Sequence, residues 1–285
     1  MTVAFRIDRR ALRRSLDRAA ATFDDAAVLQ AEVRERLLER LSYVAFTPTT
    51  VLDLGCRTGR GALALAARYP QAEVIAVDLS LAMLRQADEP PFARVCADHA
   101  RLPLRDASVD LLFSNLALPW CDDLDAVFRE FRRVIRPNGL VHFTTLGPGT
   151  LCELRAASGG GPDGHALAEM HDIGDGLLRA GLAEPVLDVE HYTLTYRDVA
   201  ALMRDLRAIG AGNVSAARSR GLTGRGRLAT LASAYEPMRR EGVLPASCEV
   251  VFGQAWGPAH EPLRERRRGE FTIDPTSIGH RGRRE

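Results

Sequence analysis

The chain has 285 residues, of which 46% are hydrophobic and 26% charged, with a formal net charge of +1. This composition is ordinary for a globular protein. The sequence has no run of about 18 or more apolar residues, so we expect no transmembrane helix. The small net charge argues against a nucleic-acid partner. Five scattered cysteines fit neither a disulfide framework nor a zinc site, so we expect reduced thiols in a cytoplasmic protein with no membrane partner.

The N-terminal part of the sequence is predicted to be helical. Residues 11–41 carry an apolar stripe that is interrupted near Asp24 and Asp25, which indicates two helices. The first twenty residues are rich in arginine and amphipathic, as mitochondrial transit peptides are, but the acids within them argue against that interpretation.

Residues 51–145 alternate short apolar strands with helices. The pattern predicts strands at 51–54, 74–77, 93–97, 109–114 and 140–144, and helices at 59–69, 80–86 and 124–135. Such alternation is typical of a mostly parallel sheet that is covered by helices on both faces.

The later part of the chain adds two more strands. We expect helices at 173–180, 198–209 and 228–240, and strands at 185–194 and 248–256. A turn is expected at 136–139, and the segment SGGGPDG at 158–164 indicates a flexible loop. The tail at 258–285 is rich in Arg, Gly and Pro and shows no hydrophobic periodicity, so we expect it to be disordered.

The stretch VLDLGCRTGR at 51–60 reads as a strand that runs into a glycine turn. Glycines allow the backbone to approach a ligand closely, and the following helix presents N–H groups to it. The glycine spacing differs from the G-x-G-x-x-G of a dinucleotide site, and the strand carries an acid, Asp53. This combination favours S-adenosylmethionine (SAM), whose ammonium group an acid can bind, over the pyrophosphate of an NAD-dependent dehydrogenase.

Two further acids follow the next strands. Asp78 is placed to bind both ribose hydroxyls, and Asp98 is placed to bind the adenine amino group. Each acid alone would as readily be a helix cap or a solvated turn residue. Three acids at successive strand ends favour a SAM site, because open α/β sheets bind ligands at the carboxyl ends of their strands.

These motifs resemble those of class I SAM-dependent methyltransferases. VLDLGCRTG, AVDLS, CADHARLPL, SNLALPW and RVIRPNGL match the successive motifs of that family. More narrowly, nearly the whole chain resembles the malonyl-acyl-carrier-protein O-methyltransferases of biotin synthesis, in RAAATFDDAAVLQ, LMRDLRAIGAGN, SRGLTGRGRL and AYEPMR. A mitochondrial relative that assists respiratory complex I assembly shares many of these features.

The resemblance implies an α/β fold of the Rossmann-like class I methyltransferase type, with a mostly parallel seven-stranded sheet and helices on both faces. Residues 1–46 would form an N-terminal helical lid, and residues 47–257 the methyltransferase domain. Helices around 160–182 and 197–240 would form an inserted substrate cap.

The resemblance also implies an activity. The family methylates the free carboxylate of a malonyl thioester, carried by acyl-carrier protein or as malonyl-CoA, and the ester hides a charge so that fatty-acid enzymes can extend the chain. A carboxylate with a reference pKa of about 4 is already ionised, so an in-line SN2 transfer needs no general base, and positioning supplies most of the catalysis. The alternative is a catalytically weak or inactive relative that acts as a binding or assembly factor.

Site residues follow from the same resemblance. The first candidate for the cation that holds the acceptor carboxylate is Arg204 and the second is Arg207, on one face of a helix, unless both are solvated surface residues. Phe23 and Trp120 would line the pocket, although the sequence fits a core aromatic at Trp120 equally well. Cofactor-binding residues are expected to be Asp53, Gly55, Arg57, Gly59, Asp78, Leu79, Met83, Asp98, His99, Asn115 and Leu116. The histidines show no metal-ligand spacing, so no metal is expected.

Two of these residues depart from the pattern of the family. Its turn usually has glycine where this chain has Arg57, whose side chain would point near the cofactor or force the loop outward. Its lid usually reads RAAATY, so that Phe23 replaces a tyrosine and lacks a hydroxyl. A basic cluster of Arg132, Arg133 and Arg136 either faces an acidic carrier protein or is a solvated helix end.

Overall fold

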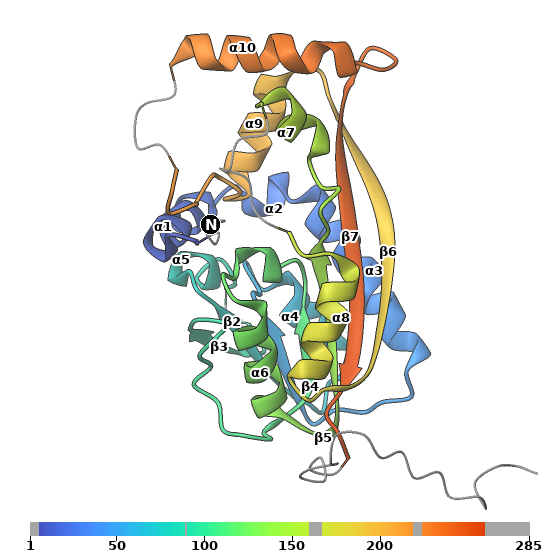
Figure 1. Cartoon of the computed structure of the whole chain (residues 1–285). Coiled ribbons are helices and arrows are strands. Elements are labelled where there is room, and N and C mark those ends of the chain that lie inside the picture. Colours follow the sequence, from blue (N-terminus) through green and yellow to red (C-terminus); the bar gives the residue numbers. More distant parts are fainter. Residues whose placement is uncertain (1–5, 89, 160–166, 219–223, 260–285) are drawn as a thin grey trace, which may run out of the picture.

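A seven-stranded sheet forms the centre of the computed structural model, which describes residues 6–88, 90–159, 167–218 and 224–259 (Figure 1). Most of the expected tail and most of the expected loop at 158–164 lie outside the described residues. The strands are β1 (Thr50–Leu54), β2 (Glu73–Asp78), β3 (Ala93–Cys96), β4 (Val109–Ser114), β5 (Ile135–Leu146), β6 (Ala183–Tyr196) and β7 (Leu244–Trp256).

The sheet has the order β3-β2-β1-β4-β5-β7-β6. Neighbours from β3 to β5 pair in parallel, whereas β7 runs antiparallel to both β5 and β6. The mostly parallel, Rossmann-like sheet that the sequence predicts is therefore confirmed. Strand order reverses between β1 and β4, and ligands of open α/β sheets bind at such a reversal, outside the carboxyl ends of the strands.

Helices cover both faces of this sheet. Those before β4 are α1 (Arg9–Ala19), α2 (Phe23–Ala26), α3 (Val28–Arg40), α4 (Arg60–Arg68) and α5 (Leu81–Leu84). Those after it are α6 (Leu124–Val134), α7 (Cys152–Ala157), α8 (Met170–Arg179), α9 (Val199–Ala208) and α10 (Arg225–Tyr235). Short 3-10 turns are η1 (Leu41–Tyr43), η2 (Leu118–Trp120) and η3 (Glu236–Met238). No helix in the described ranges is long and apolar enough to cross a membrane.

Apolar spacing decides which side of each helix packs on the sheet. In α6, Val127, Phe131 and Val134 recur every three or four residues, and they are buried together with Phe128. Asp123 caps this helix, since its side chain accepts a hydrogen bond from Ala126 N at 2.9 Å. α6 and α8 share one hydrophobic layer with the sheet, and α3 and α4 share the layer on its other face.

The N-terminal region forms three helices where the sequence predicts two. α1 ends before the short α2, and α3 follows after Ala27, whose backbone (φ −85°, ψ 47°) is not helical. A helix of only four residues, such as α2, is too short to show a period in the sequence. Asp8 N donates to Val214 O at 2.8 Å, which ties the start of α1 to the segment that follows α9.

The last two strands form a ribbon that extends beyond the rest of the sheet. β7 pairs with β5 only from Val250 onward, but it pairs with β6 as far as Leu244. In Figure 1 the helices α7, α9 and α10 gather around this far end. α8, by contrast, buries Ile173 and Leu177 against the sheet, so the cap expected around 160–182 is not built by α8.

β5 begins earlier than expected and contains the predicted turn at 136–139. Its pairing with β4 shifts register between Val109 and Leu111, and Asn138 has a φ of 60°. The turn residues therefore form an irregularity inside a longer strand, because pairing on both sides of them holds the chain extended.

Candidate functional site

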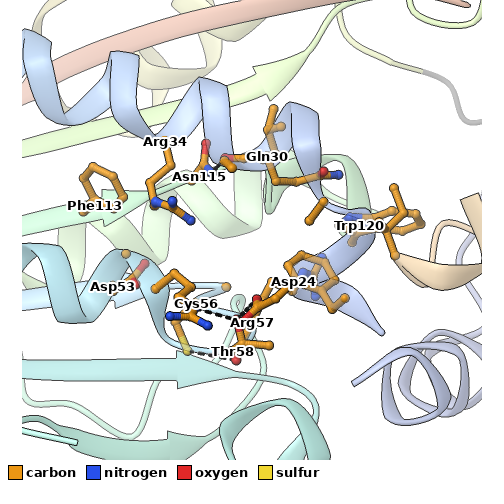
Figure 2. Close-up of a pocket in the computed structure, with 18 of the residues that line it drawn as sticks. Asp24, Gln30, Arg34, Asp53, Cys56, Arg57, Thr58, Phe113, Asn115 and Trp120 are labelled. Carbon is orange, nitrogen blue, oxygen red and sulfur yellow. Dashed lines mark hydrogen bonds and ion pairs between the residues drawn. The ribbon is translucent and has the colours of Figure 1, made fainter. Parts of the chain in front are cut away.

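A cavity of about 380 Å³ lies at the carboxyl edge of the sheet (Figure 2). β1 and the turn after it form one wall, the end of β4 forms another, and α2 and α3 close the opposite side. The expected site residues that line this cavity are Phe23, Asp53, Gly55, Arg57, Asn115, Leu116 and Trp120.

Asp53 is the buried acid of this cavity. Its residue is only 2% exposed, and Oδ2 has no hydrogen-bond partner among the described residues. Burial raises the pKa of this carboxyl to about 7. Gly61 passes so near that a Cβ there would lie 2.7 Å from Oδ2. A buried acceptor without a donor, beside open space, fits a cationic group of a ligand.

The turn after β1 adopts left-handed backbone at three alternate positions. Gly55 and Gly59 have φ values of 74° and 84°, and Arg57 between them has a φ of 53°. A Cβ on Gly55 would lie 2.3 Å from the Cβ of Ala117, so only glycine fits there. Arg57 carries a side chain in a conformation that costs an L-residue roughly 1–2 kcal/mol.

Asp78, the acid expected to bind the ribose, is already in contact with Arg57. It is fully buried and accepts hydrogen bonds from Arg57 N at 3.1 Å and Ser80 N at 2.8 Å. Nη1 of Arg57 lies 3.5 Å from Oδ2 of Asp78, and the arginine side chain is only 12% exposed. Arg57 therefore folds onto the expected ribose site instead of forcing the loop outward.

The expected adenine end of the site is narrow. A cavity of only about 20 Å³ lies beside Leu79, Asp98 and His99. Arg9 of α1 forms an ion pair with Asp98, and Met83 is fully buried in the hydrophobic cluster beneath α1. The first helix thus covers the acid that the sequence assigns to adenine.

His99 adds a neutral imidazole to this end. It is buried, and burial lowers the pKa of the imidazole to about 4, so His99 is uncharged near neutral pH. Nδ1 lies 3.6 Å from Sγ of Cys121, and Nε2 has no partner in the described part of the chain. Within the same ranges, no three His, Cys, Asp or Glu residues are grouped to hold a metal ion.

The N-terminal helices are attached to the site by polar contacts. Asp24 accepts hydrogen bonds from Thr58 Oγ1 at 2.5 Å and from Arg60 Nε at 2.8 Å. Ser80 Oγ donates to Asp17 at 2.6 Å. These contacts hold α1 and α2 over the glycine turn and over the end of β2.

Asn115 joins the end of β4 to α3. Its Nδ2 donates to Gln30 O at 2.9 Å, and its Oδ1 accepts from Thr144 Oγ1 at 2.9 Å. Leu116 follows with a φ of 52°, and its N–H donates to Thr144 Oγ1 at 3.0 Å. Asn115 therefore serves as a structural link and also lines the cavity.

A second cavity of about 420 Å³ adjoins the first and is mostly apolar. Its walls come from α7, α9, β6, β7 and the segment after α9. The residues shared by the two cavities are Gln30, Leu116, Trp120 and Ile209. A polar chamber thus opens beside an apolar one, which suits a charged ligand in one and an acyl chain or similar group in the other.

The structure separates the two arginine candidates of α9. Arg207 lines the apolar cavity, whereas Arg204 is exposed and lines none of the three cavities. Phe23 lines the polar cavity, and Trp120 borders all three. The geometry therefore favours Arg207 over Arg204, which reverses the order expected from the sequence.

Arg34 of α3 is a site residue that sequence reasoning missed. Its side chain lines the polar cavity and points towards the side where Asp53 lies (Figure 2). Its positive charge partly opposes the rise in the pKa of Asp53. The sequence held only a weak sign that Arg34 belongs to the site, namely that it directly follows Val33, a buried residue on the apolar stripe of this helix.

Two of the three arginines of the basic cluster at the end of α6 have ion-pair partners within the chain. Arg133 pairs with Asp106 and Glu130 at 2.7 and 2.6 Å, and Arg136 pairs with Asp110 at 2.7 Å. Asp110 lies near the start of β4, at the amino edge of the sheet and away from both cavities. Arg133 and Arg136 hold the fold together there, so the interpretation that these two face a carrier protein is not supported.

Comparisons with known proteins find methyltransferases similar to this chain. A methyltransferase domain model matches residues 52–143. The malonyl-acyl-carrier-protein O-methyltransferase of Methylovorus sp. (strain MP688) is 51% identical over 90% of this chain and 91% of its own length. That of Laribacter hongkongensis (strain HLHK9) is 48% identical over 96% and 98%. Phosphoethanolamine N-methyltransferase 2 of Haemonchus contortus, solved with phosphomonomethylethanolamine and S-adenosylhomocysteine, is similar in fold only: the TM-score is 0.54 at 21% identity, over 87% of this chain and 60% of that one.

Proposed function

Because the chain belongs to the malonyl-acyl-carrier-protein O-methyltransferase family, we propose that it transfers a methyl group from SAM to the free carboxylate of malonyl-acyl-carrier protein. The high identity over nearly the full length supports an active enzyme rather than an inactive relative. The observation within the structure that carries the proposal is the junction of a polar and an apolar cavity at Leu116, Trp120 and Ile209.

The residues of the polar cavity fit SAM. Asp53 Oδ2, buried and without a partner among the described residues, binds the ammonium group, and Arg34 balances the carboxylate of the same methionine portion. Asp78 accepts the ribose hydroxyls once Arg57 moves away from it. Bound SAM supplies an electrophilic methyl group on a sulfonium, which the acceptor oxygen takes as the carbon–sulfur bond breaks.

The apolar cavity holds the malonyl thioester. Arg207 lines it and pairs with the acceptor carboxylate, which keeps that group ionised and oriented without removing its nucleophilic lone pair. Trp120 and Ile209 border both cavities and exclude water from the junction. No side chain has to accept a proton, because a carboxylate is already deprotonated near neutral pH. Catalysis then rests on positioning the two reactants.

The test is direct transfer. Purified protein with SAM and malonyl-acyl-carrier protein should yield the methyl ester, detected as a gain of one methylene in the intact mass of the carrier. Succinyl-carrier protein and carrier protein without an acyl group serve as controls. Calorimetric binding of SAM without any ester from malonyl-carrier protein would contradict the enzyme and favour a binding factor.

We further infer that the ester serves biotin synthesis. The support is the family itself, since an ester that hides the malonyl charge allows fatty-acid enzymes to extend the chain. Expression of this chain should restore growth without biotin to a bacterium that lacks its own malonyl-carrier methyltransferase. An Asp78→Asn variant, expressed at the same level, should not restore it.

A further inference from the structure

The outward face of α1 carries a row of arginines. Arg10, Arg14 and Arg18 recur every four residues and are exposed, whereas Leu12 and Leu16 on the opposite face are buried. Residues four apart lie on one side of a helix, so the three guanidinium groups project in the same direction. None of the three has an ion pair within the described part of the chain.

The inner flank of the same helix is held by polar contacts at the cofactor site. Arg9 pairs with Asp98, and Asp17 accepts a hydrogen bond from Ser80 Oγ at 2.6 Å. The charges on this flank thus have partners at the cofactor site, but those of the outward row do not. Like charges four residues apart destabilise a helix, so the row of arginines does not stabilise α1.

α9 extends the positive charge of this row. Ser15 Oγ donates to Gly210 O at 3.1 Å and Thr22 Oγ1 donates to Ala208 O at 3.0 Å, which places α1 against the end of α9. Arg204 and Arg207 of α9 are exposed and have no ion pair among the described residues. We define the α1–α9 basic surface as Arg10, Arg14, Arg18, Arg204 and Arg207.

This surface borders the entrance of the apolar cavity. Arg207 is exposed and also lines the cavity, so the cavity reaches the protein surface beside it. Ala211 and Gly212 line the cavity too, and a Cβ on Gly212 would lie 3.6 Å from Ser15 Oγ of α1. A partner seated on α1 would therefore lie next to the opening through which an acyl group enters.

We propose that the α1–α9 basic surface docks the acyl-carrier protein, whose acidic residues meet the arginines while its acyl arm enters the cavity past Arg207. This inference rests on the proposed function, since it names where the carrier of that substrate binds. Complementary charge raises the rate of encounter and fixes the orientation of the partner. A lipid surface fits less well, because the apolar face of α1, with Leu12 and Leu16, is buried and cannot insert.

The experiment compares two substrates. The double variant Arg14→Glu with Arg18→Glu should raise KM for malonyl-acyl-carrier protein at least about tenfold, whereas kcat/KM for malonyl-pantetheine, which lacks the protein, should change less than about twofold. A control double variant, Arg68→Glu with Arg105→Glu, alters exposed arginines at the amino edge of the sheet and should match the wild type on both substrates.

Several outcomes would overturn the assignment. An unchanged KM for the carrier protein, or equal losses on both substrates, would show that the surface does not dock the carrier. Binding of the wild type to vesicles of anionic phospholipid that the glutamate variant loses would assign the surface to a membrane instead. If the glutamate variant folds poorly by circular dichroism, Arg14→Gln with Arg18→Gln should still raise KM about threefold. Absence of ester from the wild type on either substrate would contradict the proposed function itself, whereas ester formation with an unaffected variant contradicts only the docking surface.

Discussion

The polar and apolar cavities adjoin, yet the chain builds them in different ways. The polar cavity takes Asp53, Gly55 and Arg57 from the end of β1 and the turn after it, and its other charged lining residues, Asp24, Asp25, Arg34 and Arg60, come from α2, α3 and the start of α4. The apolar cavity draws its walls from segments between Ala26 and Cys248 that lie far apart in the sequence. A charged ligand is recognised by a few well-placed polar atoms, whereas an acyl group is recognised by a shape that many side chains share. Single substitutions should therefore act sharply in the first cavity and more gradually in the second.

The sharpest test of the cofactor side of this comparison is Asp78→Asn, which changes the fully buried acid beneath Arg57, a residue that lines the polar cavity. Asparagine has one carbonyl oxygen, so it cannot accept from Arg57 N, Ser80 N and the ribose hydroxyls as the carboxylate does. We expect the Kd for SAM, measured by calorimetry, to rise at least about 100-fold, or about 2.7 kcal/mol. Asp106→Asn, which changes an exposed acid at the amino edge of the sheet, is the control. A Kd within about threefold of the wild type would contradict a ribose-binding role.

Arg207→Ala tests the only charged group that we assign to the acceptor in the apolar cavity. Loss of a charge-assisted contact costs about 1.5–3 kcal/mol, so KM for malonyl-pantetheine should rise about 10- to 100-fold. The use of that small substrate removes any contribution from docking of the carrier. Arg204→Ala, three residues away and outside the cavities, should change KM less than about twofold. A larger effect of Arg204→Ala would restore the order expected from the sequence.

The pH dependence of SAM binding tests Asp53. Burial raises the pKa of its carboxyl from 3.8 to about 7, so the group is increasingly neutral below pH 7 and cannot pair with an ammonium. The affinity for SAM should therefore fall below pH 7, approaching about tenfold for each unit. Asp53→Asn should bind weakly at every pH and lose this slope. A slope that persists in the variant would assign the titration to another group.

The raised pKa of Asp53 also makes the stability of the ligand-free protein depend on pH. The folded-state pKa of Asp53 lies above its unfolded value, so its contribution to stability is present below about pH 4 and is lost as pH rises through about 7. Asp53→Asn should thus raise the melting temperature more at pH 8 than at pH 5. Bound SAM should remove this difference in the wild type, because it supplies the missing cation.

The smallest expected effect is an increase in the affinity for the cofactor, caused by Arg57→Gly. The substitution removes the guanidinium that lies 3.5 Å from Asp78 and relieves a positive φ. We expect SAM and S-adenosylhomocysteine to bind about three- to tenfold more tightly. Arg57→Ala removes the guanidinium but keeps the backbone strain, so tighter binding in both variants would identify the side chain as a competitor. Weaker binding in both would show that Arg57 contacts the bound cofactor.

Local sequence patterns were enough to predict the sheet and the acids at its edge. Apolar strands that alternate with helices leave little choice but a parallel sheet, and parallel strands bring their carboxyl ends to one edge. Asp53, Asp78 and Asp98 could therefore be placed together without coordinates, because each lies within or just after its own strand. Gly55 could be predicted for a similarly local reason, the positive φ that its turn requires.

The orientation of the helices towards that edge could not be predicted in the same way, because it depends on packing between distant segments. Arg204 and Arg207 are three residues apart, and only the packing of α9 on α1 and the β6–β7 ribbon selects which of them lines the cavity. Packing also turned Arg34 towards Asp53 and paired Arg133 with Asp106. The position of a residue at a strand end follows from the local geometry of the strand. The direction of a helical side chain depends instead on which neighbours bury the rest of the helix, and those neighbours are distant in sequence.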